Sequence, residues 1–193
     1  DSTNITTQNI TINLTDVNEA PVFTSDATFS AAENQTAIGE VVSLDVDAGD
    51  SITYSISGSE LAITSASTSG SGAVGVLTFA SAPDYETKST YTATVTASDG
   101  TNSTTQSITV NVTDVNEAPT FTSSASFSAA ENQTTIGSVS VTDPENATLS
   151  YSLSGTDASS LAVSSSGVLS FGSAPNYESK NSYSATVAAS DGT

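Results

Sequence analysis

One six-residue segment near the middle of the sequence, Asp-Val-Asn-Glu-Ala-Pro at 114–119, combines oxygen-bearing side chains with a restricted backbone. Asp114, Asn116 and Glu117 offer side-chain oxygens as possible ligands, and Val115 and Ala118 offer only their backbone carbonyls. Pro119 disfavours helical backbone at the preceding residue, so we expect the segment to be extended. An oxygen-rich segment without a nearby cationic side chain suits a hard metal ion. The segment therefore predicts the floor of a calcium cluster.

The chain is strongly acidic, with 21 Asp and Glu residues against two lysines, Lys88 and Lys180, and a formal net charge of −19. Nucleic acids and anionic membranes bind proteins through Lys and Arg, so this balance argues against both partners. Two interpretations remain open. The acids could form a solvated, halophilic-type surface, or their charge could be partly neutralised by bound divalent metal ions.

Cys, Met, His and Trp are absent from the sequence. Zinc and most transition metals therefore lack their preferred ligands, and neither thiol catalysis nor a Ser-His-Asp triad is possible. No disulfide can stabilise the fold, so stability must come from core packing and, we argue, from metal. No apolar run is long enough to span a bilayer, and no signal peptide is visible. We expect no membrane insertion.

The sequence repeats itself. The motif at 16–21 recurs 98 positions later at 114–119, and Ala31–Thr36 recurs as Ala129–Thr134 at the same spacing. Ala82–Glu86 recurs as Ala174–Glu178, only 92 positions later. The second copy has therefore lost residues, and we expect the change in the Ser/Gly stretch Thr64–Gly75, as a surface loop.

The repeat also predicts the domain organisation. Residues 1–19 match the segment before 118 and are interpreted as the last strand and exit linker of a preceding repeat. Residues 20–117 are one complete repeat. Residues 118–193 are a second repeat that lacks its final strand. We interpret the chain as part of a longer tandem array.

Each repeat shows short segments in which apolar and polar residues alternate, separated by turn signals. Seven strands are predicted in the complete copy, at 27–32, 39–46, 51–57, 60–64, 76–80, 90–98 and 103–113. This pattern predicts an all-β fold of tandem seven-stranded Greek-key β-sandwiches arranged end to end. Asp99-Gly100 should begin a hairpin turn between the last two strands. The expected core residues are Tyr54, Leu77, Phe79, Tyr91 and Val95.

Four motifs in fixed order resemble the cadherin repeat: Glu33 in Ala-Glu-Asn, Asp84-Tyr85-Glu86, Ala97-Ser98-Asp99, and the exit linker at 114–119. The resemblance is to tandem bacterial cadherin-like repeats of large surface adhesins, and it covers essentially the whole chain. Two positions depart from the pattern. Glu117 stands where the linker usually carries Asp, and Asn176 replaces the acid found at Asp84 in the first copy.

The resemblance implies a set of calcium ligands at the central junction. They are Glu33, Asp84, Glu86, Asp114, Asn116, Glu117, Asp143, Glu145 and Asp191, with carbonyls from Val115, Ala118 and the Asn146 region. At the first junction six of these nine side-chain ligands have counterparts: Asp16, Asn18, Glu19, Asp45, Asp47 and Asp99. We expect one ion there at most. Glu131 and Glu178, at the far end, should be empty or weakly filled.

Repulsion between the predicted ligands favours the metal interpretation. Two carboxylates ~5 Å apart at an effective dielectric of ~20 repel by roughly 3 kcal/mol. Two or three Ca²⁺ ions would reverse the sign of that energy. We therefore expect the two repeats to hinge freely without metal and to form a stiff junction with it.

These features favour calcium-rigidified spacer or adhesion repeats of a large secreted or surface-bound bacterial protein, with neighbouring repeats of the same chain as the first partners. A carbohydrate-binding module of a polysaccharide-degrading system is the alternative, and a glycan pull-down with and without calcium separates the two. Homophilic adhesion is a third hypothesis. A glycosidase carboxylate pair is disfavoured, because the acids recur at junctions rather than in one cleft, and we expect no enzyme.

The unequal ends of the sequence suggest a further partner. The second copy lacks a final strand, and residues 4–14 read as a spare one. An unpaired sheet edge invites a matching strand. We therefore expect head-to-tail strand exchange between copies of the chain, by which the spare strand of one molecule completes the second repeat of another.

Overall fold

The structure is a computed structural model that describes residues 3–47, 49, 51–67 and 72–193. The chain folds into two compact units, Asp1–Thr113 and Asp114–Thr193, called unit 1 and unit 2 below. Strands dominate both units, which confirms the predicted all-β class. The repeat boundaries at 20–117 and 118–193 remain predictions from the sequence period.

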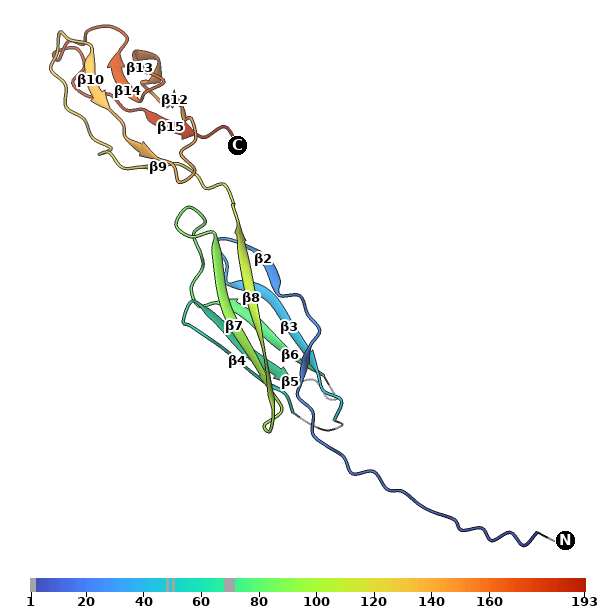
Figure 1. The fold of residues 1–193 in the computed structure, drawn as a ribbon. Coiled ribbons are helices and arrows are strands. Elements are labelled where there is room, and N and C mark those ends of the chain that lie inside the picture. The colour runs from blue at the N-terminus through green and yellow to red at the C-terminus, as the bar shows by residue number, and fades with distance from the viewer. Residues whose placement is uncertain (1–2, 48, 50, 68–71) are drawn as a thin grey trace. The chain divides into compact units, whose positions relative to one another are not determined.

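Unit 1 contains two four-stranded sheets. One has the order β1-β3-β6-β5 and the other has the order β2-β8-β7-β4 (Figure 1). All the neighbouring strands pair antiparallel except β2 and β8, which pair parallel over five positions. The strands are β1 Val22–Phe23, β2 Thr28–Ala32, β3 Ala37–Leu44, β4 Thr53–Ile56, β5 Leu61–Ser67, β6 Gly72–Phe79, β7 Thr90–Ser98 and β8 Ser103–Thr113.

The core of unit 1 lies between the two sheets, because each strand turns alternate side chains inward. On β8, Ile108, Val110 and Val112 are buried while the intervening residues are not. The predicted core residues Leu77, Phe79 and Val95 are all buried. The predicted Tyr91 is only partly buried, and its ring packs edge-on against Phe79 with 5.1 Å between centroids.

Tyr54, the fifth predicted core residue, is buried and brings a polar group into the core. Its hydroxyl donates to the carbonyl oxygen of Ala73 at 2.8 Å and lies 2.7 Å from the hydroxyl of fully buried Ser43. Burial raises the pKa of Tyr54, so the phenol stays neutral. The contact joins residues of both sheets, since Tyr54 belongs to β4 and its partners to β3 and β6.

The seven predicted strands are present in unit 1, and the structure adds an eighth. Strand β1 has two residues, pairing Val22 with Leu44 and Phe23 with Ser43, and is too short to show alternation. The prediction of a surface loop over Thr64–Gly75 was wrong. Most of that stretch lies in the ladder between β5 and β6, where Ser65 pairs with Gly75. Only 68–71 of it falls outside the described residues.

Residues 4–14 are predicted as the last strand of a preceding repeat, and that assignment remains a prediction. Residues 3–21 form no strand and run as an extended coil before β1 (Figure 1). A strand is defined by a ladder with a neighbour, and no described segment pairs with this one. Its apolar side chains are consequently exposed, among them Ile10, Ile12 and Leu14.

Unit 2 repeats the strand order of unit 1 with shorter ladders. Its sheets have the orders β10-β14-β13, β11-β9 and β12-β15. The elements are β9 Thr120–Phe121, β10 Thr135–Ser138, β11 Val141–Thr142, β12 Ser150–Ser154, the 3₁₀ turn η1 Ala158–Ser160, β13 Leu161–Val163, β14 Val168–Phe171 and β15 Thr186–Ser190.

Two strands of unit 1, β2 and β8, have no counterpart among the described residues of unit 2, and the two absences are linked. Residues 126–130 match β2 in sequence but form no strand. In unit 1, β2 forms its ladder with β8 alone. Among the described residues of unit 2, no strand corresponds to β8, so 126–130 lacks the neighbour that would order it. In the part of the chain that the structure describes, no helix is both long and apolar enough to cross a membrane.

Candidate metal-binding clusters

The first group of predicted ligands in unit 1 lies where the segment before β1, the loop after β3 and the β7–β8 turn meet. We call it the linker cluster of unit 1, made of Asn18, Glu19, Asp45, Asp47 and Asp99. The Asn18 side-chain amide donates to Asp99 Oδ2 at 2.9 Å, and the Glu19 backbone N–H donates to Asp47 Oδ2 at 2.9 Å. The three segments are thus held together by carboxylate and amide groups.

Two acidic side chains of this cluster are fixed by local backbone donors. Asp99 Oδ1 accepts the N–H groups of Thr101 and Asn102 at 2.6 Å each, as the predicted hairpin turn requires, with Gly100 at a φ of +99°. The N–H bond from Asn102 is the main cause that lowers the pKa of Asp99. Asp45 Oδ1 accepts the N–H of Asp47 at 2.9 Å. Both side chains are therefore held as oriented carboxylates.

Unit 2 contains a similar arrangement, which we call the linker cluster of unit 2. It is made of Asn116, Glu117, Asp143, Glu145 and Asp191. The Asn116 amide donates to Asp191 Oδ2 at 2.7 Å, and the Glu117 N–H donates to Glu145 Oε1 at 3.1 Å. Asp143 Oδ1 accepts the N–H of Ala147 at 2.9 Å. The bond from Asn116 lowers the pKa of Asp191, and hydrogen bonding with Glu117 lowers the pKa of Glu145. The two units thus share the amide-to-aspartate bond and the bond from the linker N–H to a carboxylate.

Both linker clusters contain buried carboxylate oxygens without a donor. Asp45 is only 5% exposed, and its Oδ2 has no hydrogen-bond partner among the described residues. The same holds for Asp143 Oδ2 and Glu145 Oε2 in unit 2. A buried, unpartnered charged oxygen is costly, so such atoms indicate a missing positive partner. A cation that accepts only oxygen ligands fits this donor set.

A second group of predicted ligands, the strand-end cluster of unit 1, lies beside the last residue of β8. It consists of Glu33, Asp84 and Glu86. Glu33 is only 3% exposed, its N–H donates to the Thr113 carbonyl at 3.1 Å, and its Oε2 accepts the N–H of Tyr85 at 2.7 Å. Asp84 Oδ1 accepts the N–H of Thr87 at 2.9 Å, and Glu86 is exposed on the same turn.

The equivalent cluster of unit 2 contains Glu131, Asn176 and Glu178. The Tyr177 N–H donates to Glu131 Oε2 at 3.0 Å, and the Ser179 N–H donates to Asn176 Oδ1 at 3.2 Å. The backbone is therefore the same as in unit 1, but Asn176 offers a neutral oxygen in place of a carboxylate. All three side chains are exposed.

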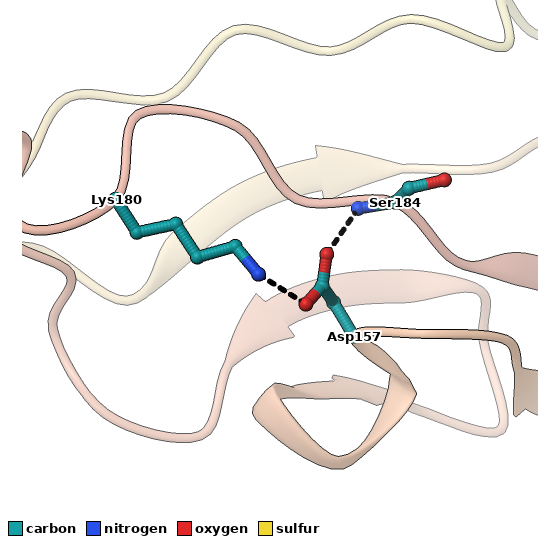
Figure 2. A network of polar contacts seen from close by, with 3 residues as sticks. All are labelled: Asp157, Lys180 and Ser184. Carbon is teal, nitrogen blue, oxygen red and sulfur yellow. Dashed lines mark hydrogen bonds and ion pairs between the residues drawn. The ribbon is translucent and has the colours of Figure 1, made fainter.

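The two lysines of the chain form ion pairs with acids that belong to neither kind of cluster. In unit 1, Lys88 Nζ lies 2.5 Å from Glu60 Oε1 and 4.4 Å from the centre of the Tyr91 ring. In unit 2, Lys180 pairs with Asp157 and lies 4.8 Å from the centre of the Tyr183 ring. Figure 2 shows Asp157 receiving both the Lys180 ammonium and the Ser184 N–H. Neither ammonium therefore pairs with a carboxylate of the linker clusters.

The remaining predicted ligands lie in or next to the linkers. Asp16 is exposed on the coil before β1, and Asp114, Val115 and Ala118 are exposed at the start of unit 2. Asn146 has a left-handed backbone, with a φ of 57°, and its N–H donates to the Asp143 carbonyl at 3.1 Å. The assembly of the strand-end cluster of unit 1 and the linker cluster of unit 2 around shared ions remains a prediction.

Sequence reasoning missed two residues that position ligands. The Asn102 side-chain amide donates to the Asn18 carbonyl at 2.9 Å, which holds the coil before β1 against the β7–β8 turn. The sequence carried a weak signal for it, because Asn102 is the third residue after the acid of the Asp99-Gly100 turn. The backbone donor of Tyr85 to Glu33 was also missed, and a contact between residues so far apart in sequence has no local signal.

Comparisons with known proteins agree with this fold. The sequence profile of a family described as bacterial Ig domain matches residues 18–113. The cadherin EGF LAG seven-pass G-type receptor 1 of Mus musculus is 36% identical over 144 residues, covering 69% of this chain and 5% of the receptor. The Homo sapiens receptor of the same name is 37% identical over 121 residues, covering 60% of this chain and 4% of the receptor. The chain thus spans a small part of these relatives.

Solved structures give the same result. Mouse cadherin-23 domains EC22–24 match with a TM-score of 0.55 and 24% identity, over 88% of this chain and 58% of that structure. Protocadherin gamma B2 domains 3–6 match with a TM-score of 0.56 and 26% identity, over 90% of this chain and 47% of that structure. This is an adhesion-type fold, a non-enzymatic kind of domain. The strand order, the repeated clusters and these matches together identify the chain as cadherin-like repeats with an immunoglobulin-like fold.

Proposed function

We propose that the chain is a calcium-binding spacer or adhesion segment of a large extracellular bacterial protein, in which Ca²⁺ stiffens the junctions between repeats. The supporting observation is that the linker cluster is built twice, with the same amide-to-carboxylate bond and a buried Asp oxygen without a donor in each unit. Oriented carboxylates, an amide and backbone carbonyls are the ligands that Ca²⁺ prefers.

At the central junction the ions would be shared across the peptide bond between Thr113 and Asp114. Glu33, Asp84 and Glu86 would supply carboxylates from the strand-end cluster of unit 1. The linker cluster of unit 2 would supply Asn116, Glu117, Asp143, Glu145 and Asp191, with Asp114 and the carbonyls of Val115, Ala118 and Asn146 completing the ligand set. Bound Ca²⁺ would neutralise these acids, which no lysine of the chain does.

The first junction would use the same kinds of ligand. The linker cluster of unit 1 offers three aspartates, a glutamate and an amide, with Asp16 nearby. Glu131 and Glu178 are exposed and stand beside the neutral Asn176, so the strand-end cluster of unit 2 should bind weakly.

The functional consequence concerns shape and reach rather than catalysis. Tandem repeats that contact only their neighbours make an extended rod when each junction is rigid and a flexible string when it is not. Extracellular fluids contain millimolar free calcium, which is enough to fill calcium sites of modest affinity. We therefore place the chain at the cell surface or in a secreted protein, and we assign it no catalytic role.

Small-angle X-ray scattering of the full chain in millimolar Ca²⁺ and in EDTA tests the proposal. We expect a narrower distribution of interdomain distances in Ca²⁺. The double variant Glu33→Gln with Glu86→Gln should abolish the difference between the two buffers. The control, Asp26→Asn with Glu40→Gln, removes an equal number of charges outside both clusters and should preserve that difference. Identical scattering curves of the wild type in Ca²⁺ and in EDTA would contradict the proposal.

A further inference from the structure

Each unit contains one basic side chain, and that side chain stands beside candidate calcium ligands. Lys88 is the only lysine or arginine of residues 1–113, and it follows Asp84 and Glu86 by four and two positions. The Lys88 N–H donates to the Asp84 carbonyl at 2.9 Å, so the three residues share one turn. A lysine ammonium is carried on a flexible four-carbon stem, and Coulomb attraction favours its contact with a neighbouring carboxylate. Such a contact would place a cation on the calcium ligands.

The ion pair of Lys88 is with a different acid. Lys88 Nζ lies 2.5 Å from Glu60 Oε1 and 4.4 Å from the centre of the Tyr91 ring. Glu60 belongs to the connection between β4 and β5, and Tyr91 belongs to β7. A carboxylate and an aromatic face each attract an ammonium. Together they bind the Lys88 ammonium outside the strand-end cluster of unit 1, although acids of that cluster are its neighbours in sequence.

Unit 2 repeats this arrangement with a different acid (Figure 2). Lys180, its only lysine or arginine, follows Glu178 by two positions. It pairs with Asp157 and lies 4.8 Å from the centre of the Tyr183 ring. Asp157 stands four positions before the start of β13, whereas Glu60 stands one position before the start of β5. The acid differs in type and in position, so what the two units share is the ion pair itself.

The ligand-bearing turn of unit 1 is held by bonds that do not involve the lysine side chain. The Thr87 N–H donates to Asp84 Oδ1 at 2.9 Å, and the Tyr85 N–H donates to Glu33 Oε2 at 2.7 Å. Lys88 contributes only its backbone N–H, a donor that every residue except proline has. The side-chain ion pair is thus available for an electrostatic role.

We propose that Glu60 and Tyr91 hold the Lys88 ammonium away from the strand-end cluster of unit 1 and thereby raise the affinity of that cluster for Ca²⁺. The proposal rests on the function proposed above, because it concerns the same ligands. An ammonium bonded to Asp84 or Glu86 would occupy an oxygen that Ca²⁺ needs and would repel the ion. Glu60 is thus a positioning residue, which acts on the metal site through the lysine and is not itself a ligand.

Calorimetric titration of the full chain with Ca²⁺ tests the proposal, measured in the component of the isotherm that Glu33→Gln with Glu86→Gln removes. Glu60→Gln frees the ammonium and should weaken this binding by about 3- to 10-fold. Glu40→Gln removes an equal charge from an exposed position of β3 and should change it by less than about twofold. In a chain that carries Lys88→Gln, adding Glu60→Gln should change the affinity by less than about twofold, because no ammonium remains to compete.

Zero-length crosslinking with a water-soluble carbodiimide, followed by peptide mass spectrometry, locates the ammonium independently of calcium binding. In calcium-free buffer the wild type should join Lys88 to Glu60. The Glu60→Gln chain should join Lys88 to Asp84 or Glu86 instead. Saturating Ca²⁺ should suppress that second crosslink, because the metal occupies the carboxylates.

Three results would overturn this inference while the proposed function stands. They are equal Ca²⁺ affinities of the wild-type and Glu60→Gln chains, a loss of affinity in Lys88→Gln as large as that in Glu60→Gln, and no crosslink from Lys88 to Asp84 or Glu86 in the Glu60→Gln chain. The second result would mean that the ion pair only fixes the turn. A wild type that binds no Ca²⁺ would overturn the proposed function and this inference together.

Discussion

Replacing Asp143 by Asn should change the stability of unit 2 in opposite directions with and without calcium. Asp143 Oδ1 accepts the Ala147 N–H, a bond that the Asn oxygen retains. Its Oδ2 is buried without a hydrogen-bond partner in the described part of the chain. Asp143→Asn therefore removes one charge from the linker cluster at nearly constant shape.

The expected changes in the unfolding free energy of unit 2 come from reduced charge repulsion in EDTA and from the loss of a ligand in Ca²⁺. In EDTA, two carboxylates ~5 Å apart repel by roughly 3 kcal/mol at an effective dielectric of ~20. Water and salt reduce this for partly exposed groups, so we expect the variant to be more stable by about 1 kcal/mol. In saturating Ca²⁺ the loss of a charged ligand should weaken binding by about 10- to 100-fold, which destabilises unit 2 by about 1.4 to 2.8 kcal/mol.

Thermal unfolding followed by far-ultraviolet circular dichroism measures both effects, since about 1 kcal/mol shifts the Tm of a domain of this size by about 4 to 8 °C. Asp26→Asn, which removes the charge of an exposed acid outside both clusters, is the control and should behave alike in both buffers. A Tm for Asp143→Asn that moves the same way in Ca²⁺ and in EDTA would refute the reasoning.

Two further predictions concern contacts within single units. Tyr54→Phe should destabilise unit 1 by about 2 kcal/mol in urea unfolding, because it leaves the buried Ser43 hydroxyl and the Ala73 carbonyl without their partner. Tyr151→Phe, at the matching position of unit 2 where Val141 replaces Ser43, should cost much less, and equal losses would contradict this account. Below the ordinary Asp pKa, unit 2 should lose stability that Asp157 provides. The bond from Lys180 lowers the folded-state pKa of Asp157, so its contribution is complete above the unfolded-state pKa of about 3.9 and is lost as the pH falls through the folded value. Asp157→Asn should remove that part of the pH dependence between pH 6 and pH 3, and an unchanged pH profile would count against the prediction.

Alternation of apolar and polar residues predicted most strands of unit 1, because each of its longer strands has one face in the core. Residues 4–14 and 126–130 show similar patterns but form no strand in this structure. Both segments have strand sequences, but a ladder also needs a neighbour, and periodicity within one segment carries no information about its partner. The rule also ended strand β5 too early, at Thr64, whereas the β5–β6 ladder continues through Ser65, Ala66 and Ser67.

The ligand types of the candidate clusters could be predicted because oxygen-bearing residues recur in the same order in both copies. Their geometry could not. Asp99 and Asn18 are far apart in sequence, and only the fold shows that an amide joins them. The buried state of Asp45 Oδ2 is likewise a product of packing from several segments, so no single motif reveals it.

The parallel pairing of β2 with β8 affects how unit 1 carries mechanical load. Tension applied where the chain enters and leaves this unit pulls the two strands lengthwise in opposite directions. The five paired positions from Thr28 to Ala32 are then loaded in shear together, instead of being unzipped one after another.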